Sequence, residues 1–150
     1  MTPVTSARRR ALVGASLSAG FLLLAVAFPA AWAQDPGSTL VQKTAREWLA
    51  MADVDDGAGS WKAAGKKFQV AMPADAWTQA LADVHLPIGR MQQRAMVGTT
   101  FDKSFAGAPE GDYASVEFHT SFMGRKDAPE TVTLERESDG VWRVIGYSIR

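Results

Sequence analysis

The spacing of apolar residues changes near residue 90, and this change limits the folds open to the chain. Before that point apolar residues recur at intervals of three and four, which gathers them on one side of a helix. After it they alternate with polar residues, as in a strand with one buried face. The sequence therefore predicts helices first and an antiparallel sheet afterwards. The clearest helical stripe consists of Val41, Ala45, Trp48, Leu49 and Ala52.

Three helices are expected in the first half. A capping box of Thr39 and Gln42 starts the first, because a hydroxyl and an amide there can each satisfy a free backbone N–H. The second covers residues 60–68. The third begins at Pro73, whose fixed φ suits a first helical position, and ends or kinks just before Pro87.

Four strands are expected in the second half. The first covers residues 91–101 and is followed by a loop over residues 102–112. The next segment alternates plainly, so its two faces can be assigned. One face carries Val116, Phe118, Thr120 and Phe122, and the other carries Ser115, Glu117, His119 and Ser121.

The last two strands are expected to form a hairpin. Asp139-Gly140 favours a two-residue type I′ turn, in which both positions need positive φ. With that turn, Leu134 lies opposite Ile145, and Val132 lies opposite Tyr147. One face of the hairpin then holds Val132, Leu134, Ile145, Tyr147 and Ile149.

The first 33 residues are predicted to be a signal peptide. Arginines 8–10 precede an apolar stretch over residues 11–28, and Ala31 and Ala33 give the small residues that signal peptidase requires. We expect cleavage after Ala33 and a periplasmic or secreted protein that is exported by the Sec route. A twin-arginine signal is the weaker alternative, and a membrane anchor retained over residues 11–28 is another.

The composition after cleavage excludes several classes of protein. Loss of three arginines leaves 13 basic residues against 16 acidic ones, so the domain carries no cationic surface for nucleic acid or for anionic lipid. The chain has no cysteine, which excludes disulfides, thiol chemistry and lipid attachment. We expect a flexible lead over residues 34–38 and a single domain over residues 39–150.

The expected fold is α+β, with three N-terminal helices packed on a four-stranded antiparallel curved sheet. This order resembles the NTF2-like or cystatin-like architecture, a curved sheet around a helix. Several segments carry a second resemblance: residues 45–49, 60–61, 76–77, 80–81, 107–111, 118–122, 130–133 and the ending Asp-Gly-Val-Trp-Arg-Val-Ile-Gly-Tyr-Ser-Ile-Arg. In these segments the chain is similar to the bacterial family called domain of unknown function 4019. That family has no established activity, so the resemblance implies fold and export but no catalytic residue.

Metal and cofactor sites are not expected. Asp53, Asp55 and Asp56 do not fit a calcium loop, because the turn glycine and the last acidic ligand are missing. His85 and His119 are far apart, without a second ligand at helical spacing. Phosphate-binding and dinucleotide-binding glycine motifs are absent from the sequence.

Glu117 and His119 are the only acid–base candidates for catalysis that the pattern offers. They share the outward face of a strand at i and i+2, where a carboxylate could raise the imidazole pKa. A solvent-facing polar row is the favoured interpretation, because the opposite face carries the apolar residues that the helices should cover. His85 is expected to stabilise the end of the third helix through the helix dipole.

Trp142 and Val144 are expected to form a partner surface. In the predicted register both lie on the outward face of the sheet, where two apolar residues suggest cover by another molecule. We expect a homodimer or a contact with an envelope protein there.

The most consistent function is therefore that of an exported, non-catalytic domain that binds a small apolar ligand or an envelope protein. The alternative is a small-pocket enzyme of the isomerase or hydrolase type, with a lone acid–base residue. Such an enzyme needs an ionisable group on the inward face. The inward polar residues that the pattern offers are Arg94, Arg143 and Tyr147, none of them an obvious base.

Overall fold

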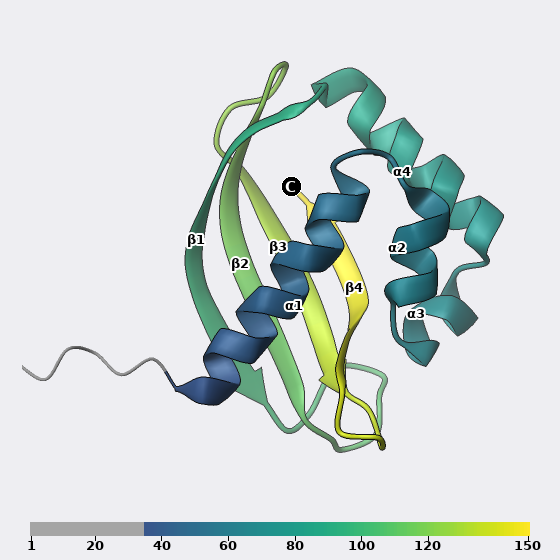
Figure 1. Cartoon of the computed structure of the whole chain (residues 1–150), viewed down its shortest axis with the longest axis vertical. Helices are drawn as coiled ribbons and strands as arrows, with labels where there is room; N and C mark the ends of the chain where they lie inside the picture. Colours follow the sequence, from purple (N-terminus) through teal and green to yellow (C-terminus); the bar gives the residue numbers. More distant parts are fainter. Residues whose placement is uncertain (1–34) are drawn as a thin grey trace, which may run out of the picture. The chain divides into compact units, whose positions relative to one another are not determined.

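The computed structural model describes residues 35–150, which form four helices and one antiparallel sheet (Figure 1). The signal peptide predicted for residues 1–33, with Ala31 and Ala33, lies outside the described residues. The α+β class and the four-stranded curved sheet are confirmed, but there are four helices rather than three. The helices are α1 (Pro36–Ala52), α2 (Gly57–Ala63), α3 (Lys66–Ala71) and α4 (Ala74–Ile88), and the strands are β1 (Met91–Asp102), β2 (Tyr113–Phe122), β3 (Ala128–Arg136) and β4 (Trp142–Ile149).

Helix α1 begins earlier than the sequence predicts. Pro36 occupies its first turn, because a fixed φ and a missing N–H suit that position. Residues 36–38 are therefore helical and do not belong to a flexible lead. The capping box at Thr39 is also wrong, since Gln42 donates instead to the hydroxyls of Ser38 at 2.8 Å and Thr99 at 3.0 Å.

The predicted helix over residues 60–68 is divided into α2 and α3. The backbone is extended at Ala64 and Gly65, with ψ of 163° and 162°. There the N–H of Gly65 donates to the carbonyl of Val144 at 2.8 Å, so the break between the helices is bonded to the edge of β4. The end of α4 also differs from the prediction, because the helix continues through Pro87 to Ile88.

The sheet is a meander in the order β1-β2-β3-β4, and α1 crosses one of its faces (Figure 1). We call this the inner face. Helices α2, α3 and α4 lie beside β4. The apolar side chains between α1 and the sheet are 0–2% exposed, so they pack directly against one another. These side chains belong to Val41, Ala45, Trp48, Leu49, Val116, Phe118, Val132 and Leu134.

Aromatic rings join the smaller helices to this core. Trp77 of α4 lies 5.6 Å from Trp48 and 5.0 Å from Phe68, measured between ring centroids. The Tyr147 ring lies 5.3 Å from that of Trp48. The tryptophans of α1 and α4 are thus core residues, held by edge contacts as well as by burial.

The turn of the last hairpin differs from the predicted type I′ turn. The N–H of Gly140 donates to the carbonyl of Glu137 at 2.8 Å, and the N–H of Glu137 donates to the carbonyl of Val141 at 3.0 Å. Of the turn residues, Gly140 alone has positive φ, at 80°. This is a turn followed by a left-handed glycine, which adds one residue to the loop.

The longer turn shifts the register by one residue. Leu134 pairs with Val144 rather than with Ile145, and an irregularity between Thr133 and Leu134 restores the predicted pairing of Val132 with Tyr147. Val144 is therefore on the inner face and only 1% exposed. Trp142, two residues away, lies on the same face and packs against the core. The outward placement of Trp142 and Val144, on which the predicted partner surface depended, is therefore wrong.

None of the helices within residues 35–150 combines the length and apolar character needed to span a bilayer.

Candidate functional site

A buried charged network lies on the inner face at the end of the sheet next to the α1–α2 loop. The Arg94 guanidinium binds the Asp53 carboxylate through two hydrogen bonds of 2.8 Å. It also donates to Glu130, from Nε at 2.6 Å and from Nη2 at 3.1 Å. The Glu130 carboxylate accepts two further hydrogen bonds, from Thr120 at 2.6 Å and from Tyr147 at 2.8 Å.

The charged groups of the network bind one another, and these contacts shift their pKa values. Burial alone would lower the pKa of Arg94, but the hydrogen bonds from its guanidinium to Asp53 and Glu130 outweigh burial and raise that pKa. Burial and the neighbouring Glu130 raise the pKa of Tyr147. A carboxylate has about four acceptor positions, and Glu130 uses all four. It therefore has no lone pair left to accept a proton from a substrate.

The sequence identified only part of this network. Arg94 and Tyr147 were expected on the inner face, whereas the expectation of an interior without a carboxylate was wrong. Glu130 lies two residues before the buried Val132, so strand alternation could have placed it inward. Asp53 belongs to a loop, where no periodic pattern applies, and could not have been found in this way.

Each acidic residue of the α1–α2 loop has its own protein partner. Asp53 binds Arg94, Asp55 lies 2.8 Å from Nδ1 of His85, and Asp56 accepts the N–H of Gly59 at 2.8 Å. The three carboxylates thus fix the loop against β1, α4 and α2.

His85 pairs with Asp55 through its ring, which differs from the expected stabilisation of the helix end by the dipole. Its Nε2 atom is buried and has no partner among the described residues. A general base needs contact between a ring nitrogen and the substrate. The Asp55–His85 pair has the orientation of a catalytic pair, but its free nitrogen is sealed from solvent.

Glu117 and His119 form no hydrogen bond to each other. Both are exposed on the outer face of β2, as predicted. His119 binds Asp127 instead, with 2.7 Å between Nδ1 and Oδ1. The two residues therefore form a solvent-facing row.

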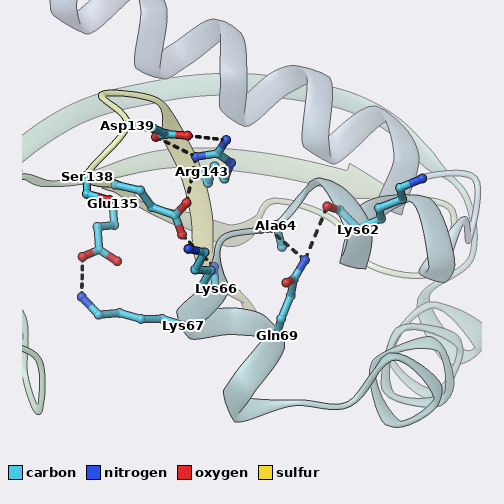
Figure 2. A pocket seen from close by; sticks show the side chains of 10 residues that line it. Lys62, Ala64, Lys66, Lys67, Gln69, Glu135, Ser138, Asp139 and Arg143 are labelled. Carbon is cyan, nitrogen blue, oxygen red and sulfur yellow. Dashed lines mark hydrogen bonds and ion pairs between the residues drawn. The ribbon is translucent and has the colours of Figure 1, made fainter.

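A charged cleft of about 450 Å³ separates α2 and α3 from the β3–β4 hairpin (Figure 2). Arg143 lies here and not in the interior, in contrast to the prediction. It binds Glu137 at 2.8 Å and Asp139 at 2.9 Å, and its hydrogen bond lowers the pKa of Asp139 to about 2. Lys67 is paired with Glu135 across the cleft. The Lys67–Glu135 pair and the N–H of Lys66, which donates to Glu137 at 2.7 Å, fasten α3 to the hairpin. The side chains of Lys62 and Lys66 also line the cleft and form no ion pair among residues 35–150.

A second pocket, of about 370 Å³, lies where all four strands end; we call it the sheet-end pocket. Phe101 and Trp142 meet here edge to face, with ring centroids 6.0 Å apart. They come from β1 and β4, which are not neighbours in the sheet. The lining residues are Phe101, Asp102, Lys103, Asp112, Tyr113, Arg136 and Trp142.

Two rows of paired residues explain this geometry. The first row runs Phe101, Ala114, Leu134, Val144 across the inner face. The methyl of Ala114 leaves room over β2, so rings from the outer two strands can approach each other. Arg136 pairs with Trp142 in the next row, so its side chain also lies on the inner face. Phe101 remains 44% exposed at this end.

The charges around the sheet-end pocket are partly satisfied. Lys103 binds Asp112, and this hydrogen bond lowers the pKa of the Asp112 carboxyl. Arg136 donates from Nε to the carbonyl of Gly140 at 3.2 Å and forms no ion pair among residues 35–150. The pocket thus combines aromatic walls with one guanidinium that forms no ion pair, and the charge of this guanidinium also helps to lower the pKa of the Asp112 carboxyl.

Comparison with known proteins gives one match. The model of a family described as "Protein of unknown function (DUF4019)" matches residues 44–147, which include both the buried network and the sheet-end pocket. No curated protein and no solved structure matches the chain.

Replacement of Arg94 by methionine should strongly destabilise the fold. It would leave Glu130 and Asp53 as buried charges without a counter-ion, and breaking such a pair costs about 3–5 kcal/mol. Urea denaturation should record this loss as a lower free energy of unfolding. Lys43→Met, at the exposed Lys43–Glu47 pair, is the matched control and should change it by less than about 1 kcal/mol. Equal effects of the two substitutions would contradict a structural role for the network.

Proposed function

We propose that this chain, which belongs to the DUF4019 family, is an exported, non-catalytic domain that binds a small ligand with an apolar body in the sheet-end pocket. The observation that carries the proposal is the edge-to-face pair of the exposed Phe101 and the half-buried Trp142, in a pocket to which four strands contribute. We also propose that the architecture is NTF2-like or cystatin-like.

The chemistry of the sheet-end pocket favours ligand binding. Small-molecule sites are concave and are lined by aromatic side chains with a few polar groups. A ring that is 44% exposed, such as Phe101, gains free energy when a ligand removes its apolar surface from water. The volume of about 370 Å³ suits a ligand of one or two rings.

The titratable groups favour binding over catalysis. Glu130 is saturated with hydrogen bonds, and Nε2 of His85 is sealed. At the sheet-end pocket itself, Lys103 lowers the pKa of Asp112, which makes that carboxylate a weaker base. The alternative of an isomerase or hydrolase thus lacks a free acid–base group among these residues.

Export rests on the first 33 residues. The arginines at 8–10, the apolar stretch and the pair Ala31 and Ala33 together support cleavage by signal peptidase. A ligand from the cell envelope or its surroundings is then the natural occupant.

Expression of the full chain in a bacterial host tests the export proposal. We expect a soluble periplasmic protein whose first residue is Gln34, identified by mass spectrometry of the intact chain. Replacement of Ala33 by arginine should block processing, because the peptidase accepts only small residues there. Recovery of the unprocessed wild-type chain from the cytoplasm would refute export.

A neutral apolar fluorophore such as N-phenyl-1-naphthylamine tests the pocket. We expect one molecule to bind per chain with increased fluorescence. Phe101→Ala should weaken binding about tenfold or more, because burial of an aromatic side chain contributes about 1.5–3 kcal/mol of free energy. Leu86→Ala is the control, since Leu86 is 88% exposed and lies on α4, away from the pocket. Binding that Phe101→Ala leaves unchanged would place the ligand elsewhere.

A further inference from the structure

Arg136 differs from the other charged groups of the sheet-end pocket. Lys103 and Asp112 are bound to each other. Asp102 also lines the pocket, but it follows Phe101 directly on β1, so alternation turns its side chain toward the opposite face of the sheet from Arg136. Arg136 shares the inner face with Trp142 and has no carboxylate within ion-pair distance in the part of the chain that the structure describes.

The guanidinium of Arg136 is also held in place. Its Nε donates to the carbonyl of Gly140, which belongs to the turn of the same hairpin. Gly140 has positive φ, so the turn geometry fixes the direction of that carbonyl. One nitrogen is thereby fixed, while the two Nη groups make no hydrogen bond to the described residues. A guanidinium held in this way loses less freedom when it binds an anion than a mobile lysine does.

The position of Arg136 beside two rings suggests a particular kind of ligand. A planar guanidinium offers parallel N–H donors that match the two oxygens of a carboxylate. Phe101 and Trp142 provide an apolar wall on the same inner face. A molecule with an apolar ring and a carboxylate could contact both at once.

We propose that the sheet-end pocket selects amphiphilic carboxylates, with the ring against Phe101 and Trp142 and the carboxylate on the Nη groups of Arg136. This inference rests on the proposed function and specifies the chemical class of its ligand. Arg136 is the residue that discriminates anionic ligands from neutral ligands of the same shape, since Lys103 is occupied by Asp112.

Two probes of the same shape test the proposal: 1-naphthoate, which is anionic, and 1-naphthalenemethanol, which is neutral. Isothermal titration of the full processed chain should give a dissociation constant at least about tenfold lower for naphthoate, the factor that corresponds to one charge-assisted hydrogen bond of about 1.5 kcal/mol. The advantage should shrink as salt is raised, because the site is open to solvent.

Arg136→Gln should abolish the preference for naphthoate and leave the affinity for the neutral probe unchanged. Arg136→Lys should retain part of the preference, since it keeps the charge but loses the parallel donors. Arg125→Gln is the matched control, because Arg125 is an exposed arginine in the β2–β3 turn, outside the pocket. It should behave as the wild type does.

The outcomes separate the two proposals. If both probes bind with equal affinity, the carboxylate inference is overturned while the binding function stands. The same inference is overturned if Arg136→Gln keeps the preference for naphthoate. If neither probe binds at millimolar concentration, the proposed function itself fails, and the choice of ligand class fails with it.

Discussion

The fold depends on one guanidinium that is shared between two carboxylates. Arg94 on β1 joins Asp53, at the end of α1, to Glu130 on β3, and Tyr147 on β4 completes the set. The side chain of Glu130 is fully buried, so its charge is tolerable only while the counter-ion and the hydrogen bonds remain in place. These contacts fix where the end of α1 lies over the sheet.

This constraint makes the two ends of the inner face different. Near Arg94 the space under α1 is filled by long side chains that bond to one another. At the other end Ala114 stands between Phe101 and Leu134, and the rings of Phe101 and Trp142 close only part of the gap. This difference supports our proposal that a ligand binds at the end of the sheet and not in the interior. A charged network at one end and partly exposed rings at the other support the proposed binding role over the catalytic alternative.

The sequence predicted the helix and strand regions well, because periodicity is a local property. The prediction from the sequence failed at two places where a single residue changes the direction of the chain. Gly140 lengthens the hairpin turn by one residue, and this shift moved Val144 from the predicted outer face to the core. The extended backbone at Gly65, which is bonded to β4, divided a predicted helix. The first error arises from the conformation of a turn, and the second from a hydrogen bond between distant segments.

The candidate site was less predictable than the fold. Strand alternation placed Arg94 and Tyr147 on the inner face, and it could have placed Glu130 there in the same way. The sheet-end pocket requires the register of all four strands, since Phe101 and Trp142 are far apart in the sequence and lie on strands that do not pair. No local pattern contains that information.

The central claim is that the interior is closed by the charged network and that ligands enter only at the sheet end. An amide chemical-shift titration of the ¹⁵N-labelled processed chain with 1-naphthoate tests it most directly. We expect the shifts to change at Phe101, Ala114, Arg136 and Trp142, and those of Arg94, Glu130 and Tyr147 to stay constant. Changes centred on Glu130 and Tyr147 would mean that the ligand reaches the interior, and the account would be wrong.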